Sequence, residues 1–72
     1  MDEQDFIEKL KDEVLDTDSE LSLDMTLDNL DEWDSLSFVS FIAMAKESGF
    51  LRVNRDSVNR AVTVRDLFEL VK

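Results

Sequence analysis

The chain has 72 residues without cysteine, histidine or proline, which leaves room for a single domain (residues 1–72) and excludes disulfide bonds and a structural zinc site. Its 18 acidic and 8 basic residues give a net charge of −10, which argues against nucleic-acid binding because cations must replace phosphate counterions there. The acidic first residues and the shortness of the longest apolar stretch predict a cytoplasmic protein without a secretory signal or a membrane span.

Charge is unevenly distributed along the chain. Residues 1–34 contain 14 acidic residues and only two basic ones, whereas residues 35–72 contain 4 acidic and 6 basic residues. A solvated surface would explain this pattern, and so would an acidic flank that steers the protein towards basic partners. Composition alone leaves both explanations open.

The first helix is predicted over about residues 3–16, because four apolar residues recur there at helical spacing on one face: Phe6, Ile7, Leu10 and Val14. The polar residues 16–19 predict the end of this helix. Residues 17–34 then form a long connection. Five aliphatic residues spread through the connection predict that it packs against the core: Leu21, Leu23, Met25, Leu27 and Leu30.

A second helix is predicted from Ser35 to about Ser48. Asp34 is a good N-cap, because its carboxylate can accept backbone N–H groups two or three residues on, and Gly49 suits the left-handed position after the last turn. The helix is apolar almost all the way round. Its expected core stripe is Phe38, Phe41, Ile42 and Ala45. The other apolar residues are expected to be partly buried and partly a patch for partners.

The end of the chain predicts a short turn and then a helix. Residues 56–60 fit a single helical turn. Thr63 is the expected N-cap of the last helix, and Asp66 follows it at nearly the spacing of a capping box. The inner stripe of this helix is Val64, Leu67, Phe68 and Val71. The predicted fold is therefore all-α, a small bundle of three main helices plus one short helical turn, with a long first loop.

The chemistry available to such a chain is narrow. Without His, Cys or Tyr, the usual general bases and nucleophile partners are missing, so the chain is not expected to be an enzyme. The acidic run from Asp16 to Glu20 resembles the start of a calcium loop. Leu21 stands where that loop needs glycine and Leu27 where it needs its closing acid, so no metal site is predicted.

Ser35 is the remaining candidate. It is expected at the first turn of a helix, after the capping Asp34 and before a buried Leu36. Four unpaired backbone N–H groups and the positive end of the helix dipole favour a bound or attached phosphate at such a place. The alternative is that Asp34 and Ser35 simply begin an ordinary helix.

The wider context resembles the acyl carrier protein family over essentially all 72 residues. The segment from Leu30 to Leu36, read Leu-Asp-Glu-Trp-Asp-Ser-Leu, is similar to the Asp-Ser-Leu attachment site that these carriers share at the start of their second helix. The acidic first helix, the long hydrophobic loop, Val53 and the stretch from Ala61 to Leu67 agree with the family pattern. The resemblance implies the helical carrier fold.

The resemblance also implies a covalent 4'-phosphopantetheine group on Ser35. A phosphopantetheinyl transferase would attach this group from coenzyme A, using a magnesium ion that Asp34 helps to hold. Leu36, the residue after the serine, is implied to belong to the same cofactor-binding site. The thiol of this group would carry acyl intermediates as thioesters, so that a cysteine-free chain takes part in thioester chemistry. The implied partners are acyl-loading and acyl-processing enzymes of a fatty-acid, polyketide or related pathway, and a monomer is expected.

The sequence departs from the family along the second helix. Carriers of bulk fatty-acid synthesis display acidic residues there, whereas the outward positions here are expected to be Ser37 and Ser40, and the helix ends with Lys46 beside Glu47. Docking is therefore expected to use apolar contacts and the acidic loop before the helix, as in a specialised rather than a housekeeping carrier. The expected contacts are Asp28, Asp31, Glu32, Phe38, Val39 and Ala43, with Trp33 either packing on the loop or touching partners.

Two alternatives remain at the level of sequence. One is a carrier for aminoacyl or D-alanyl groups, which uses the same prosthetic arm. Asp34 before the serine favours an acyl carrier, because peptidyl carriers more often have histidine at that position. The other is an acidic interaction domain without a prosthetic group, since short motifs also arise by chance.

Overall fold

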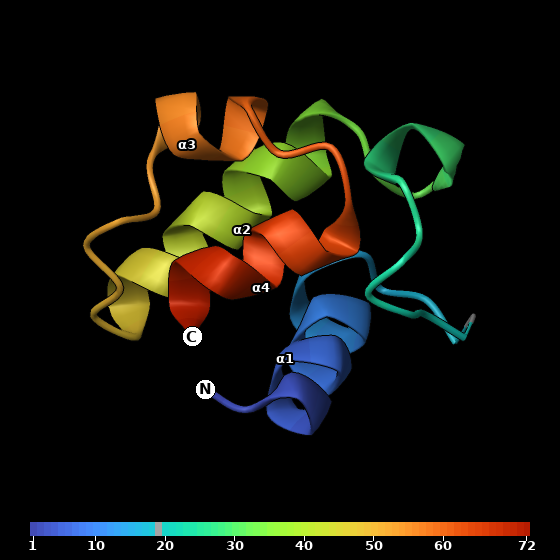
Figure 1. Ribbon diagram of the computed structural model, residues 1–72, viewed down its shortest axis with the longest axis horizontal. Coiled ribbons are helices and arrows are strands. Elements are labelled where there is room, and N and C mark those ends of the chain that lie inside the picture. The colour runs from blue at the N-terminus through green and yellow to red at the C-terminus, as the bar shows by residue number, and fades with distance from the viewer. Residues whose placement is uncertain (19) are drawn as a thin grey trace.

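Helices make up most of the computed structural model, which describes residues 1–18 and 20–72, and no strand occurs in those ranges. In chain order they are α1 (Glu3–Lys9), the π-helical turn η1 (Leu10–Val14), the 3-10 turn η2 (Leu27–Asn29), α2 (Ser35–Glu47), α3 (Arg55–Asn59) and α4 (Val64–Val71). Figure 1 shows their arrangement, with the two ends of the chain close together. The all-α prediction, with three main helices, a short one and a long first loop, is confirmed.

The first helix differs from its prediction at its end. Asp2 caps α1 by accepting the backbone N–H of Asp5 at 2.8 Å, and Phe6 and Leu10 are fully buried. The helix then widens into η1 and closes before Asp16, whose φ of +48° is left-handed and cannot continue a right-handed helix. It therefore ends two residues earlier than predicted. The wide turn places both Val14 and Leu15 in the core.

The long connection is held against the bundle, as predicted. Leu21, Leu23 and Leu27 are buried, and Met25 and Leu30 pack against the core. Backbone bonds also tie the connection to the start of α4. The Leu27 N–H donates to the Val62 carbonyl at 2.8 Å, and the Val64 N–H donates to the Met25 carbonyl at 2.9 Å. This attachment supports the segment that leads into α2.

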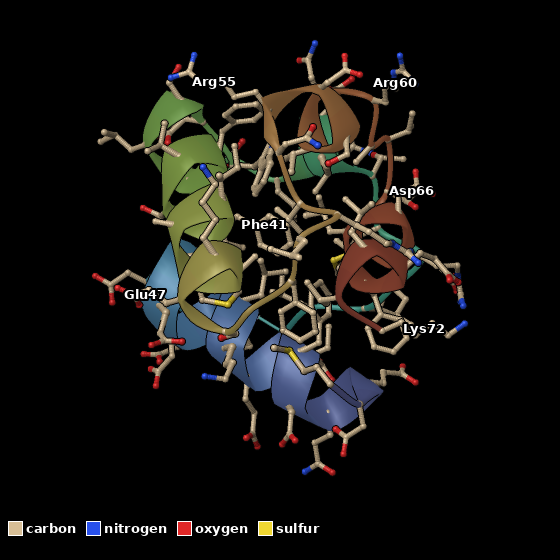
Figure 2. The ribbon with its side chains drawn as sticks, turned by 90° about the vertical axis from the view of Figure 1, so that its left-hand side faces the viewer. Phe41, Glu47, Arg55, Arg60, Asp66 and Lys72 are labelled. Atoms are coloured by element: carbon tan, nitrogen blue, oxygen red, sulfur yellow. The ribbon has the colours of Figure 1, made fainter. Side chains whose placement is uncertain are left out.

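Helix α2 supplies the centre of the core. Phe41 and Ala45 are fully buried, and Ile42 and Met44 are nearly so. The Phe41 ring meets the Phe6 ring edge-on, with centroids 6.3 Å apart and planes at 89°, and Figure 2 shows Phe41 pointing into the middle of the bundle. The predicted stripe is thus correct except that Met44 is buried where Phe38 was expected, while Phe38 is half-buried. Gly49 ends the helix with the predicted left-handed φ of +85°.

The last two helices both begin with capping boxes. In α3, Asn54 accepts the Ser57 N–H at 2.9 Å and Ser57 Oγ accepts the Asn54 N–H at 2.9 Å. The box of α4 is formed by Thr63 and Asp66, as predicted. The predicted inner stripe of α4 is buried at three of its four positions, and Phe68 is half-buried against Phe6. None of the helices in the two described ranges has the combined length and apolar character needed to cross a bilayer.

We expect Asp66 to make part of the stability dependent on pH. Backbone N–H groups of Val62 and Thr63 donate to its carboxylate at 2.9 and 3.0 Å and hold its pKa below the usual 3.8. A lowered pKa in the folded state means that the ionised group stabilises the fold above pH 3.8, and that this contribution is lost as the pH falls below it. Asp66→Asn should therefore lower the free energy of unfolding at pH 7, and the difference from the native protein should shrink at pH 3.

Urea unfolding at both pH values measures this difference. Glu47→Gln is the matched control, because Glu47 is exposed at the end of α2 and makes no ion pair or side-chain hydrogen bond within the described chain. A difference for Asp66→Asn that stays the same at pH 7 and pH 3 would contradict the assignment.

Candidate functional site

Ser35 is the first residue of α2 and is exposed. Its hydroxyl makes no hydrogen bond to the described residues and is exposed to solvent without an internal contact that holds it. Asp34 precedes it as the N-cap, in an extended conformation. The local sequence explains where the helix begins, because a capping aspartate directs the next residue into the first helical turn.

Asp34 is held as a carboxylate by the helix that it caps. Its Oδ1 accepts the backbone N–H groups of Leu36 and Ser37, each at 3.0 Å. These bonds, above all the one from Ser37, hold the pKa of Asp34 below its usual value. An anionic oxygen therefore stands one residue before the Ser35 hydroxyl at neutral pH. The same bonds correct an expectation from sequence, because two of the four N–H groups at this helix end are not unpaired.

Ser37 was predicted to face outwards, and this prediction is wrong. Its side chain is 5% exposed, and its Oγ lies 2.5 Å from the Glu32 carbonyl oxygen, to which it donates, and 3.3 Å from Asp34 Oδ1. The loop before α2 covers this face of the first turn. Ser37 therefore fixes the loop to the helix and helps to position Asp34. The three-residue spacing between an N-cap and a serine, seen also at Asn54 and Ser57, was the available signal.

Leu36 was predicted to be buried and is instead 78% exposed. It begins a line of exposed apolar residues on α2 at positions i, i+3 and i+7, which we call the outer stripe: Leu36, Val39 and Ala43. Val39 is 52% exposed. The expected patch on α2 is therefore present, but it runs from Leu36 rather than from Phe38. The inward turn of Ser37 causes the difference, because adjacent residues on a helix point about 100° apart.

Trp33 serves the core and the surface together. Its ring meets Phe41 at a tilt of 66° with centroids 6.5 Å apart, so it packs on the core side of α2, whereas the packing alternative predicted from sequence was on the loop. It also borders an open hollow of about 410 Å³, which we call the Ser35 groove. The groove is lined by Trp33, Asp34, Ser35, Phe38, Val39, Arg55 and Asn59. The last two come from α3, and sequence reasoning did not assign them to the site.

The acidic residues of the preceding loop take different roles. Asp28 in η2 and Asp31 are exposed. Glu32 is half-buried, and its Oε2 accepts the Thr17 hydroxyl at 3.1 Å, which links the two ends of the long connection. Glu32 is therefore partly a structural residue, whereas Asp28 and Asp31 present their charge to solvent. Within residues 1–18 and 20–72, no group of three or more acidic side chains is placed to hold a metal ion.

No protein-family model, curated protein or solved structure matches this chain.

Proposed function

We propose that the protein is an acyl carrier whose Ser35 is modified with 4'-phosphopantetheine and which presents acyl groups to partner enzymes. The observation that carries the proposal is the Ser35 hydroxyl, exposed at the first residue of α2 with an ionised Asp34 beside it and an open groove along it. The Asp34 cap and the buried Ser37 hold the backbone at the start of α2, and so the position of Ser35, in place.

Ser35 fits the attachment chemistry. Its Oγ would form a new P–O bond to the phosphopantetheine phosphorus of coenzyme A, lose its proton to a base of the transferase, and displace adenosine bisphosphate as the pyrophosphate P–O bond breaks. Asp34 would offer its carboxylate to the magnesium ion that neutralises the phosphates during this transfer. Its cap bonds use Oδ1, which leaves Oδ2 for the metal. Capping and metal binding are therefore compatible.

The attached group supplies a terminal thiol that carries acyl groups as thioesters, which a cysteine-free chain cannot supply itself. The protein's own contribution is to hold the attachment point on a rigid helix end and to expose it. No side chain needs to act as an acid or base in the loaded protein, which agrees with the absence of His, Cys and Tyr from the sequence.

Partner enzymes would dock on the outer stripe, with the acidic loop at its edge. The stripe carries no charge, and the exposed Asp31 lies near its beginning in the chain, whereas Lys46 and Glu47 lie at the far end of α2. Charges at the rim of an interface act mainly on the association rate. The acidic loop would therefore steer basic partners to the Ser35 end of the helix.

We expect Asp31→Lys to reduce kcat/KM for loading by a phosphopantetheinyl transferase by roughly 3- to 10-fold at low salt, because it reverses a steering charge. Glu47→Lys is the matched control at the other end of α2 and should change it less. Glu32 is unsuitable for this comparison because it accepts the Thr17 hydroxyl. Equal effects of the two reversals would count against docking at the Ser35 end.

Intact mass spectrometry tests the proposal directly. The purified protein is incubated with coenzyme A, magnesium and a broad-specificity phosphopantetheinyl transferase. We expect the mass to rise by one phosphopantetheine group, with fragmentation placing it on Ser35. An unchanged mass, with a known carrier loaded in parallel, would refute the proposal and favour an acidic interaction domain. Substrate analysis of the loaded protein would then separate acyl from aminoacyl or D-alanyl cargo.

A further inference from the structure

We infer that Arg55 binds the phosphodiester of the arm attached to Ser35 and so holds the base of the arm in the Ser35 groove. This inference rests on the proposed function and concerns a residue outside the attachment motif. Arg55 is the first residue of α3, twenty positions beyond Ser35, and lines the same groove. Figure 2 shows its side chain beside the end of α2 at which that helix begins.

The guanidinium of Arg55 is free to take a ligand. The other three arginines have partners: Arg60 pairs with Asp56 at 3.1 Å, Arg65 pairs with Asp24 at 3.2 Å, and Arg52 donates to the Glu69 carbonyl. Arg55 makes no hydrogen bond or ion pair within residues 1–18 and 20–72, although this is a chain of net charge −10. The neighbouring Asp56 does not neutralise it, because that carboxylate is turned to Arg60.

Helix stability does not explain a cation at this position. The first turn of a helix carries the positive end of the backbone dipole, so an arginine there is weakly unfavourable for α3 itself. The acid that would suit this turn, Asp56, is present beside it. The explanation that we offer instead is the negative charge that a phosphodiester on Ser35 would bring to the groove.

The groove needs a cation once a phosphodiester is attached. Such a group keeps one negative charge at physiological pH, and it would sit beside the ionised Asp34. The amides of Leu36 and Ser37, which could otherwise have stabilised it, already donate to Asp34. A guanidinium can bind two phosphate oxygens in a planar fork. Arg55 is the cationic side chain that lines the groove.

A second hollow extends the groove along α3. It is lined by Phe38, Arg55, Asp56 and Asn59, so it shares three of its four residues with the Ser35 groove. Arg55 therefore stands at the junction of the two hollows. A phosphodiester held at this point would direct the first part of the arm along α3, with the Asn59 amide available to its polar groups and Phe38 to its apolar ones.

The test compares apo and loaded forms of three proteins: the native chain, Arg55→Gln and the matched control Lys46→Gln. Lys46 is an exposed cation near the far end of α2 that does not line the groove, and it makes no ion pair or side-chain hydrogen bond within the described residues. Arg60 is unsuitable as the control, because its removal would free the neighbouring Asp56 to neutralise Arg55. Intact mass first establishes loading in each case. Thermal unfolding at low salt then gives the change in Tm caused by loading.

We expect loading to change Tm more favourably in the native chain than in Arg55→Gln, by about 2 to 5 °C, since one exposed ion pair is involved and the domain is small. Lys46→Gln should behave like the native chain, and the difference should disappear in high salt. If Arg55→Gln loads too slowly for measurement, Arg55→Lys replaces it and should show a smaller loss.

The outcomes separate the two proposals. A loaded native protein whose change in Tm equals that of the Arg55 variant would overturn the role of Arg55 and leave the carrier function standing. A native protein that never gains mass would overturn both. A loss in Lys46→Gln as large as in Arg55→Gln would mean that general charge, not the groove, is responsible, and would also overturn the inference.

Discussion

We expect the replacement of Ser35 with alanine to abolish uptake of the phosphopantetheine arm, so that the mass of Ser35→Ala stays unchanged after incubation with coenzyme A and transferase. The expected loss is complete rather than graded, because the substitution removes the oxygen that forms the new bond. Neighbouring hydroxyls cannot replace it. Ser37 is buried and donates to the Glu32 carbonyl, and Ser40 lies more than one helical turn further along α2.

Ser40→Ala is the matched control and should be loaded at the native rate. Ser35→Ala should also fold normally, with a free energy of unfolding within about 0.5 kcal/mol of the native value, because the Ser35 hydroxyl makes no hydrogen bond to the described chain. Normal folding keeps the loss of loading attributable to chemistry. Uptake of the arm by Ser35→Ala would refute the attachment site.

The largest effect on stability is expected from Phe41→Ala. Phe41 is fully buried, meets Phe6 edge-on and carries the packing of Trp33. Truncation of such a side chain costs about 3 to 5 kcal/mol, because it loses transfer free energy and leaves a cavity. A domain of this length has a total stability of about 4 to 11 kcal/mol. The variant should therefore lose a large part of the stability of the domain and unfold at a much lower urea concentration than the native protein.

Equilibrium unfolding in urea, followed by the fluorescence of Trp33, measures this change. Val39→Ala is the control, because Val39 lies on the same helix but is 52% exposed, and it should cost less than about 1 kcal/mol. Phe41→Ala should also load poorly with the transferase, since α2 would no longer present Ser35 on a fixed helix end. A loss no larger than that of Val39→Ala would show that the core does not depend on Phe41.

Loading experiments and stability experiments thus probe two different properties of one helix. The outer stripe and Ser35 face solvent, and they can be changed with little cost to folding. The buried residues of α2 determine whether the helix folds and so whether Ser35 is presented at its first turn. Helix α2 is apolar on nearly all sides because apolar residues lie on both its outer and its inner face. Leu36 and Val39 are exposed on the outer face, whereas Phe41 and Ala45 are buried on the inner face.

Sequence patterns predicted the features that depend on near neighbours. The Asp34 cap, the left-handed Gly49 and the box of Thr63 and Asp66 were all foreseen, because each is a contact between residues a few positions apart. The packing of the long connection was also foreseen, since so many aliphatic residues cannot remain in water. The predictions of which side chains of α2 are buried and which are exposed were wrong at Leu36 and Ser37. The reason is that the sequence of an almost uniformly apolar helix does not reveal which side packs against the core.

By itself, then, the sequence determined that the chain is helical, where its three main helices begin, and that Ser35 follows a capping carboxylate. Only the tertiary structure decided that Ser37 turns inwards, that Leu36 is exposed, and that Arg55 and Asn59 from α3 share a groove with Ser35. The physical reason is the range of the interactions involved. Capping acts over three or four residues, whereas the direction of a helix face and the wall of a groove depend on which distant segments pack against it.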